Sequence, residues 1–113
     1  MPIFTSPSKR YSGTVTLPEY YDWGQIMAYE AGLERARAEQ GDTLKMLSLQ
    51  AEVILPMVEA WNIQGLPEHP KSLPGTPLTA ATMLHGWLLR CIGEVMRAGD
   101  DELPFSGGAS GDG

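Results

Sequence analysis

The sequence predicts an all-α fold: a small bundle of three main helices with an extended N-terminal arm and a disordered, acidic, Gly/Ser-rich C-terminal tail. Apolar residues recur at spacings of three and four through most of residues 22–98, which is the period of one face of an α-helix. Prolines and glycines divide this pattern into three stretches. With 113 residues, 42% of them hydrophobic, the chain is long enough to bury one core.

The N-terminal part of the chain predicts extended backbone rather than helix. Residues 1–11 hold two prolines and three serine or threonine residues, so we expect a mobile arm there. In residues 12–18, SGTVTLP, apolar and polar side chains alternate, which is the period of a β-strand. Because so short a segment cannot form a sheet alone, we expect it to pack across the helices without a strand partner. The single helical domain is therefore predicted to cover residues 12–99.

The first helix is predicted over about residues 22–40. Asp22 can accept hydrogen bonds from the free backbone N–H groups of the first turn, and Gly41 is a favourable left-handed terminator. Gly32 lowers the helix propensity in the middle by roughly 1 kcal/mol relative to alanine. The apolar face that we expect to pack in the core carries Trp23, Ile26, Met27 and Leu33, with Tyr29 and Ala36 as further candidates.

The second helix is predicted over about residues 43–61, after a cap at Asp42. Its apolar residues form the most regular pattern in the chain, which consists of Leu44, Leu47, Ala51, Ile54, Leu55, Val58 and Trp61. Pro56 interrupts this pattern because it cannot donate a backbone hydrogen bond to the carbonyl of Glu52. We expect a kink at Pro56, with the helix continuing to Trp61.

The third helix is predicted over about residues 77–98. Thr76 followed by Pro77 is typical of a helix start, where a cap precedes a proline at the first helical position. The broad apolar stripe that follows suits the central helix of a bundle, and it includes Leu84, Trp87, Leu88, Cys91, Ile92 and Val95. The preceding loop, residues 62–76, is long for a compact domain, so we expect it either to pack on the core or to carry function.

Composition and charge argue against several classes of partner. The chain has a formal net charge of −6 and its eight basic residues are scattered, whereas phosphate binding needs clustered Lys and Arg. We therefore expect no nucleic-acid partner. No apolar run is long enough to cross a bilayer and the N-terminus lacks the features of a signal peptide, so we expect no membrane partner and a cytoplasmic location. Residues 100–113 are acidic and then rich in Gly and Ser, a composition typical of disorder.

The sequence does not predict catalytic chemistry. Cys91 falls on the apolar stripe of the third helix, where a buried thiol is inert. His85 lies six residues earlier, about 120° around the helix from Cys91, and we expect it to be solvated or half-buried. His69 lies in the proline-rich loop without a second metal ligand nearby. Because motifs for nucleotide, zinc-protease and serine-hydrolase sites are also absent from the sequence, we predict no enzyme, no metal and no cofactor.

The loop after the second helix raises the question of a protein-binding edge. Trp61 stands at the predicted helix end, and the apolar residues Ile63 and Leu66 follow among Gly and Pro residues. One interpretation is that these three residues, with Met57 alongside, form a docking edge for an apolar helix of another protein. The other is that Ile63 and Leu66 seal the core beneath the loop. The sequence leaves both interpretations open.

Three segments, taken in order, resemble the tail assembly chaperones of long-tailed bacteriophages. The first, SGTVTLPEYYDWGQIMAYEAGLERA, resembles the extended piece and amphipathic helix that open that family. The second, ILPMVEAWNIQGLPEHP, resembles its middle, where a helix ends in Trp before Gly-Leu-Pro. The third, MLHGWLLRCIGEV, resembles its final helix. Together they span most of the chain, from about Gly13 to Gly99.

The resemblance implies a small, helical, non-enzymatic protein of the infected host cytoplasm. Such a protein would bind the tape measure protein and help recruit tail tube protein subunits during tail assembly. The family supplies no catalytic residues, and its binding surface is not tied to a motif. The alternative is a structural or adaptor subunit of a viral or cytoplasmic complex. That subunit would form a concentration-stable oligomer, whereas a chaperone would be monomeric or weakly self-associated.

Overall fold

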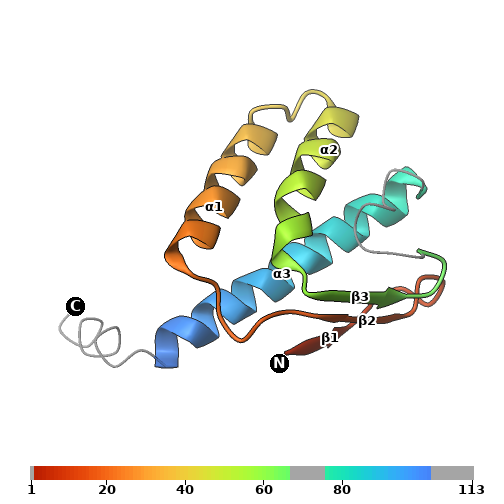
Figure 1. Cartoon of the computed structure of the whole chain (residues 1–113). Coiled ribbons are helices and arrows are strands. Elements are labelled where there is room, and N and C mark those ends of the chain that lie inside the picture. Colours follow the sequence, from red (N-terminus) through yellow and green to blue (C-terminus); the bar gives the residue numbers. More distant parts are fainter. Residues whose placement is uncertain (1, 67–75, 103–113) are drawn as a thin grey trace.

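A three-stranded antiparallel sheet accompanies the helices, so the prediction of an all-α fold is wrong. The computed structural model describes residues 2–66 and 76–102. In chain order the elements are β1 (Ile3–Thr5), β2 (Gly13–Thr16), α1 (Trp23–Arg37), α2 (Thr43–Ile54), the 3-10 turn η1 (Leu55–Met57), β3 (Ala60–Ile63) and α3 (Leu78–Glu102). The fold is therefore mixed, with helices and a small sheet in one unit (Figure 1).

The N-terminal segment forms the edge of the sheet rather than a mobile arm. β1 pairs with β2 in antiparallel register, with Ile3 opposite Thr16. Residues 12–18, expected to lack a strand partner, instead supply the central strand of the order β1-β2-β3. The two partner strands come from the arm and from a segment more than forty residues further along the chain. The alternation within residues 12–18 indicated a strand, but nothing local indicated what it would pair with.

Pro56 ends the second helix instead of kinking it. The chain leaves α2 through η1 and then becomes the strand β3. Proline has no N–H for the α-helical hydrogen bond to the carbonyl of Glu52, and its ring crowds that turn, whereas a single 3-10 turn accommodates it at its start. Trp61 consequently lies in β3, opposite Val15 of β2. The predicted helix over residues 43–61 was therefore too long, and its last part is the missing strand.

Gly13 allows β2 and β3 to approach closely. Its φ angle of +145° is one that residues with side chains rarely adopt. A Cβ atom at this position would also collide with the backbone carbonyl oxygen of Asn62 on β3. A glycine at this position therefore fixes the pairing of the two strands, with Gly13 opposite Ile63.

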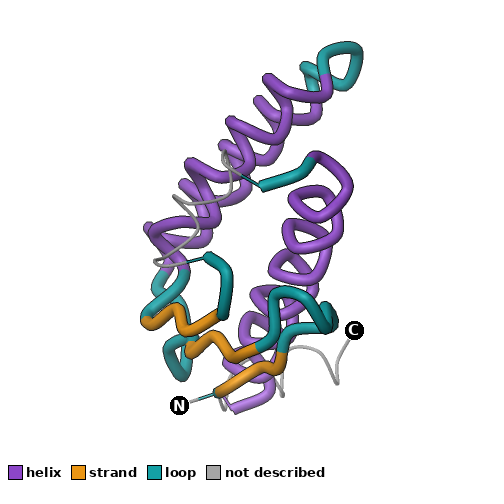
Figure 2. The backbone as a smooth tube through the Cα atoms, turned by 90° about the vertical axis from the view of Figure 1, so that its right-hand side faces the viewer, coloured by secondary structure: helices purple, strands orange, loops and turns teal. Residues whose placement is uncertain are grey.

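Helices α1 and α2 form a hairpin that projects away from the sheet (Figures 1 and 2). The caps predicted for these two helices are confirmed. The Gln25 backbone N–H donates to Asp22 Oδ1 at 2.8 Å, and the Lys45 backbone N–H donates to Asp42 Oδ1 at 3.2 Å. α1 ends at Arg37, three residues before the predicted end, and a turn connects it to α2.

The core lies between the sheet, α2 and α3. Its largest fully buried side chains are Val15, Leu17, Ile54, Leu84, Leu88 and Ile92. α3 passes beneath the α1–α2 hairpin and behind the sheet (Figure 1), which explains why its apolar stripe is broad. None of the helices in the described ranges is both long and apolar enough to span a bilayer.

α3 is longer than predicted. It continues to Glu102, so it includes the acidic residues 100–102 that we had assigned to the disordered tail. The rest of that predicted tail, residues 103–113, and residues 67–75 of the predicted loop lie outside the described residues.

Candidate functional site

Three of the four residues predicted as a protein-binding edge are buried. Met57, Ile63 and Leu66 belong to the main hydrophobic cluster, and Trp61 is partly buried against it. The Trp61 indole Nε1–H donates to the Leu66 carbonyl at 3.3 Å, which ties the turn after β3 to the strand. This burial agrees with the interpretation that Ile63 and Leu66 seal the core. A partner could contact these two side chains only after they left the core, and their role in binding stays a prediction.

Cys91 and His85 are both buried, and burial opposes their charged forms. Cys91 is buried as predicted, and the pKa of its thiol is raised to about 11, chiefly by loss of hydration. His85 is buried too, although we expected it to be solvated or half-buried, and burial lowers the pKa of its imidazole to about 4. Near neutral pH the thiol is therefore protonated and the imidazole is neutral, so neither group is activated for catalysis.

The remaining candidate for chemistry, His69, lies outside the described residues. Within residues 2–66 and 76–102, no three His, Cys, Asp or Glu side chains are grouped closely enough to hold a metal ion. That the chain is not an enzyme stays a prediction.

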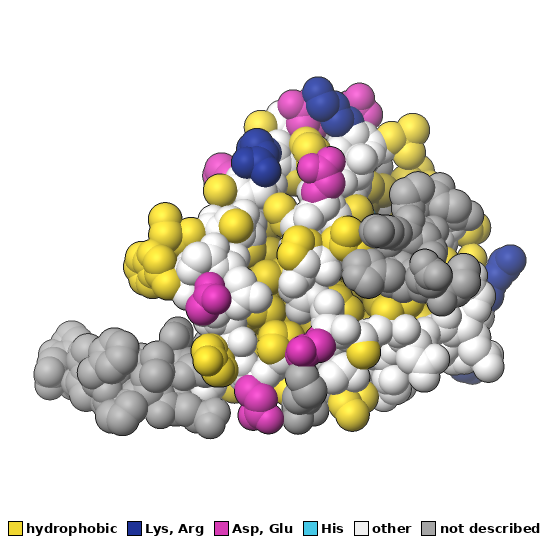
Figure 3. Space-filling view, viewed as in Figure 1, with side chains coloured by type: hydrophobic (Ala, Val, Ile, Leu, Met, Phe, Trp, Pro, Cys, Tyr) yellow, Lys and Arg dark blue, Asp and Glu magenta, His cyan; other side chains and the backbone are white. Residues whose placement is uncertain are grey.

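Three large apolar side chains are exposed at the start of α1. Trp23 is 78% exposed and Met27 is 56% exposed, although the sequence predicted both to pack in the core. They are one helical turn apart and share a face. Tyr20, just before the helix, is 67% exposed. We refer to Tyr20, Trp23 and Met27 together as the α1 surface; a hydrophobic protrusion is visible over the start of α1 at the left of Figure 3.

The buried face of α1 includes Tyr29 and Ala36, which were further candidates for the core face, together with Gly32. These three residues lie roughly opposite Trp23 around the helix axis at 100° per residue. A Cβ atom at Gly32 would collide with Val53 Cγ1 of α2. The glycine therefore lets α1 pack closely on α2, and that contact turns the α1 surface outward.

A groove between α1 and α2 borders the α1 surface. It has a volume of about 430 Å³ and is lined by Gly24, Gln25, Ala28, Tyr29, Arg35, Glu52, Val53, Pro56 and Met57. Gly24 and Ala28 are one turn apart on α1, beside the α1 surface. Small residues at such positions leave room for the side-chain ridge of another helix. Met57, one of the predicted binding residues, therefore contributes to a groove even though little of it is exposed.

Acidic side chains continue the outer face of α1 beyond Met27. Glu30 and Glu34 follow it at spacings of three and seven residues, and both are exposed. Glu34 also forms an ion pair with Arg37 at 2.8 Å, but an exposed pair of this kind contributes at most about 1 kcal/mol and leaves the carboxylate accessible. The outer face of α1 is therefore apolar at its beginning and acidic at its end.

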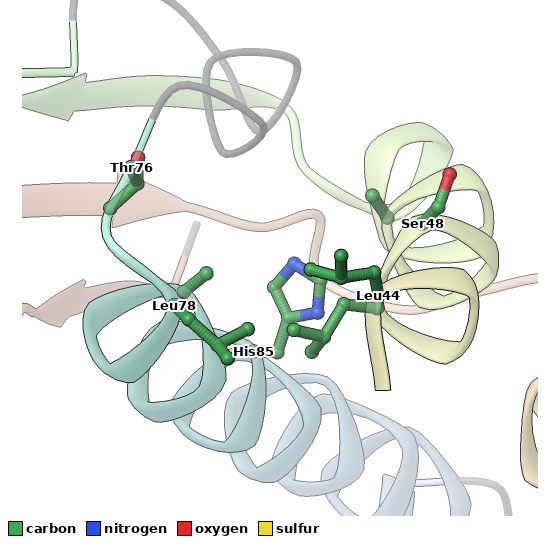
Figure 4. A pocket seen from close by; sticks show the side chains of 8 residues that line it. Leu44, Ser48, Thr76, Leu78 and His85 are labelled. Carbon is green, nitrogen blue, oxygen red and sulfur yellow. The ribbon is translucent and has the colours of Figure 1, made fainter. Parts of the chain in front are cut away.

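A second pocket lies between α2 and the beginning of α3. It has a volume of about 290 Å³ and is lined by Leu44, Leu47, Ser48, Ala51, Thr76, Leu78, Ala81 and His85 (Figure 4). Leu44 belongs to the regular apolar pattern of the second helix, yet it is 70% exposed. The reason is its position in the first turn of α2, at the end of the hairpin that projects away from the sheet (Figure 1). We refer to this site as the α2–α3 pocket.

Sequence reasoning missed both exposed sites. The only signal for the α1 surface was that Trp23 and Met27 share a helical face with Glu30 and Glu34, and acidic residues are rarely buried unless they are paired with a basic group. No corresponding signal marked the α2–α3 pocket, because its lining is drawn from two helices and its residues look like ordinary core positions.

Comparison with known proteins does not assign the chain to a family. No family model, no curated protein and no solved structure matches it. The function must therefore be argued from the surfaces described above and from the sequence motifs.

Proposed function

We propose that this protein is a non-enzymatic assembly chaperone that holds an amphipathic helix of a client protein on the α1 surface. The observation that carries the proposal is the exposure of Trp23 and Met27 on one face of α1, with Tyr20 beside them. Tryptophan and tyrosine are enriched among the residues that dominate binding at protein interfaces.

The energetics of the α1 surface favour a transient partner. Covering a tryptophan that is 78% exposed removes roughly 150 Å² from water and contributes about 4 kcal/mol before the costs of association are subtracted. Methionine adapts its shape to different apolar neighbours. The groove between α1 and α2 supplies the concave part of the same site. These features suit a helix laid into a groove, with binding that can later be released.

The client that we propose is a tape measure protein, with the tail tube protein recruited in turn. The support for this choice is the resemblance of three sequence segments to tail assembly chaperones of long-tailed bacteriophages. A tape measure protein is expected to be long and helical, with a stripe of apolar residues along its helices. Such a stripe could cover the exposed apolar residues on the outer face of α1. The sheet is a departure from the helical fold that the resemblance led us to expect, so the identity of the client rests on the motifs.

The proposal is tested by measuring the affinity of the purified chain for helical segments of the tape measure protein by calorimetry. We expect the double variant Trp23→Ala, Met27→Ala to weaken binding at least 30-fold, about 2 kcal/mol. The matched control is Ile3→Ala, which truncates an apolar side chain of similar exposure on β1 and should change affinity less than twofold. Equal losses in both variants, or none in either, would contradict the proposed site.

A structural subunit is the second candidate, and the position of β1 favours it. β1 is at the end of the strand order, and an edge strand offers backbone groups for pairing with another chain. This candidate predicts a stable oligomer whose mass in sedimentation does not change on dilution. A monomer at micromolar concentration would remove the support for this candidate.

A further inference from the structure

The α2–α3 pocket combines an apolar wall with one buried polar group. Its lining is mainly Leu, Ala and the ring of His85, with Ser48 and Thr76 as the other polar residues. Figure 4 shows the imidazole of His85 extending from α3 between Leu44 and Leu78. His85 is only 2% exposed, so its ring forms the floor of the pocket.

His85 has one satisfied and one unsatisfied ring nitrogen. Its Nδ1 lies 3.1 Å from Gln50 Oε1, and because that oxygen is an acceptor, the tautomer that satisfies this contact has its proton on Nδ1. Nε2 is then an acceptor, and it has no hydrogen-bond partner within the described part of the chain. A buried polar atom without a partner is rare in folded proteins and is costly. The neutral imidazole can accept a hydrogen bond at pH 7, since burial holds its pKa at about 4.

We propose that the α2–α3 pocket binds an aromatic side chain of a partner polypeptide that carries a hydrogen-bond donor, such as the phenol of tyrosine, and that His85 Nε2 accepts this hydrogen bond. The apolar wall would contact the ring, and the donor would satisfy Nε2, the buried side-chain atom that has no hydrogen-bond partner within residues 2–66 and 76–102.

Pocket size and the exposure of its rim identify the occupant as a side chain of a polypeptide. At about 290 Å³ the pocket is at the lower limit for a drug-sized ligand, so it fits a single ring. Leu44 and Leu78 at the rim are 70% and 48% exposed. A small molecule in the pocket would leave these leucines in water, whereas a polypeptide that inserts one side chain would cover them as well.

The α2–α3 pocket is separate from the α1 surface, so binding in the pocket does not depend on the proposed chaperone function. The pocket is lined from α2, α3 and the residue Thr76, whereas the groove beside the α1 surface is lined from α1, η1 and different residues of α2, Glu52 and Val53. A partner could therefore occupy the pocket while a client helix occupies the α1 surface.

The test uses p-cresol, which is the side chain of tyrosine with one extra hydrogen, and p-xylene, which has the same size but no donor. Both are titrated into the full chain while backbone amide resonances are followed by NMR. We expect shifts centred on residues that line the pocket, such as Ser48, Ala51 and Ala81. We also expect p-cresol to bind about fivefold more tightly than p-xylene, because one net hydrogen bond contributes about 1 kcal/mol.

Two variants identify the groups responsible. His85→Phe keeps a ring at the floor but removes the acceptor, so p-cresol should lose its advantage and bind no more tightly than p-xylene, because its hydroxyl would be buried without a partner. Ala81→Leu fills the pocket from α3, so both should bind at least tenfold more weakly. Trp23→Ala, on the α1 surface, should change neither. Circular dichroism confirms that each variant folds.

Several results would overturn the proposal. Equal affinities of the two probes in the unsubstituted chain would contradict a ligand that carries a hydrogen-bond donor. Shifts centred on Gly24 and Val53 would place binding in the groove between α1 and α2 instead of the α2–α3 pocket. A long-range ¹⁵N spectrum that places the proton of His85 on Nε2 would remove the acceptor. Self-association that p-cresol dissociates, and that Trp23→Ala abolishes, would assign the pocket to a second copy of this chain instead of a different partner.

Discussion

Helices α1 and α3 carry similar apolar residues at helical spacing, yet they place them differently. In α3 the side chains of Leu84, Leu88 and Ile92 are completely buried. In α1 the apolar side chains of Trp23 and Met27 are exposed, and the closest contact with α2 is made at the buried Gly32. The spacing of apolar residues therefore predicts a helix, while the closest approach to a neighbouring element decides which face of that helix is buried.

The largest effect on stability is expected from truncation within α3. Leu88→Ala removes a completely buried side chain and leaves a cavity in a packed core, so it should lower the free energy of unfolding by about 2–5 kcal/mol. Urea denaturation followed by circular dichroism measures this change. A loss below about 1 kcal/mol would mean that α3 is not packed as described.

The buried imidazole of His85 makes stability depend on pH. Its pKa is lowered from 6.5 to about 4 in the folded chain, so the unfolded chain takes up a proton first as the pH falls. The stabilisation from this group is therefore complete above about pH 6.5 and is lost progressively as the pH falls towards 4, by roughly 3 kcal/mol in total.

Urea denaturation of the unsubstituted chain at several pH values between 4 and 7 measures this loss. The control is His85→Leu, which removes the titrating group and should flatten this part of the profile. An unchanged profile in the variant would show that the loss comes from other groups.

The close contact of α1 with α2 should be sensitive to one methyl group. Gly32→Ala would gain up to about 1 kcal/mol in helix propensity if α1 were not packed at this position. Because the added Cβ would collide with Val53 Cγ1, we expect a net loss of about 1–3 kcal/mol in the free energy of unfolding. Gly41→Ala is the matched control, since a Cβ there meets nothing within 4 Å.

The smallest effect on stability is expected on the α1 surface. Met27→Ala removes a side chain that is largely in water, so the free energy of unfolding should change by no more than about 0.5 kcal/mol. Measured separately beside Leu88→Ala under the same urea conditions, this variant shows how differently the two helices contribute to the free energy of unfolding. A loss of 2 kcal/mol would place Met27 in the core, as the sequence suggested.

The sequence predicted the helices better than their partners. The caps at Asp22 and Asp42 and the spacing of apolar residues were enough to find α1, α2 and α3 to within a few residues at most of their ends. The sheet was missed for two reasons. The partners of β2 lie before and after it in the chain, at a distance that local patterns do not reveal. The apolar pattern that runs through Pro56 also fits either one long helix or a helix followed by a strand, and only the missing N–H of Pro56 favoured the second arrangement.

The candidate sites were predictable only in part. Burial of Cys91 and Trp87 followed from their place on the apolar stripe of α3. The outward position of Trp23 did not, because it depends on how closely Gly32 lets α1 approach α2. For Ile63 and Leu66 the sequence left open a docking edge or a seal over the core. The turn that places them is closed by the hydrogen bond from Trp61 to the Leu66 carbonyl, and the order of residues alone does not predict that bond.

The most direct test of the α1 surface as a client site is to follow the three tryptophan indole N–H signals by NMR while a helical segment of the tape measure protein is added. Trp23→Phe assigns the signal of interest. We predict that the Trp23 signal shifts on binding, because the indole becomes covered, while the signals of Trp61 and Trp87 stay in place. A shift of the Trp61 signal with an unchanged Trp23 signal would contradict the account and return the binding site to the edge formed by Trp61, Ile63 and Leu66.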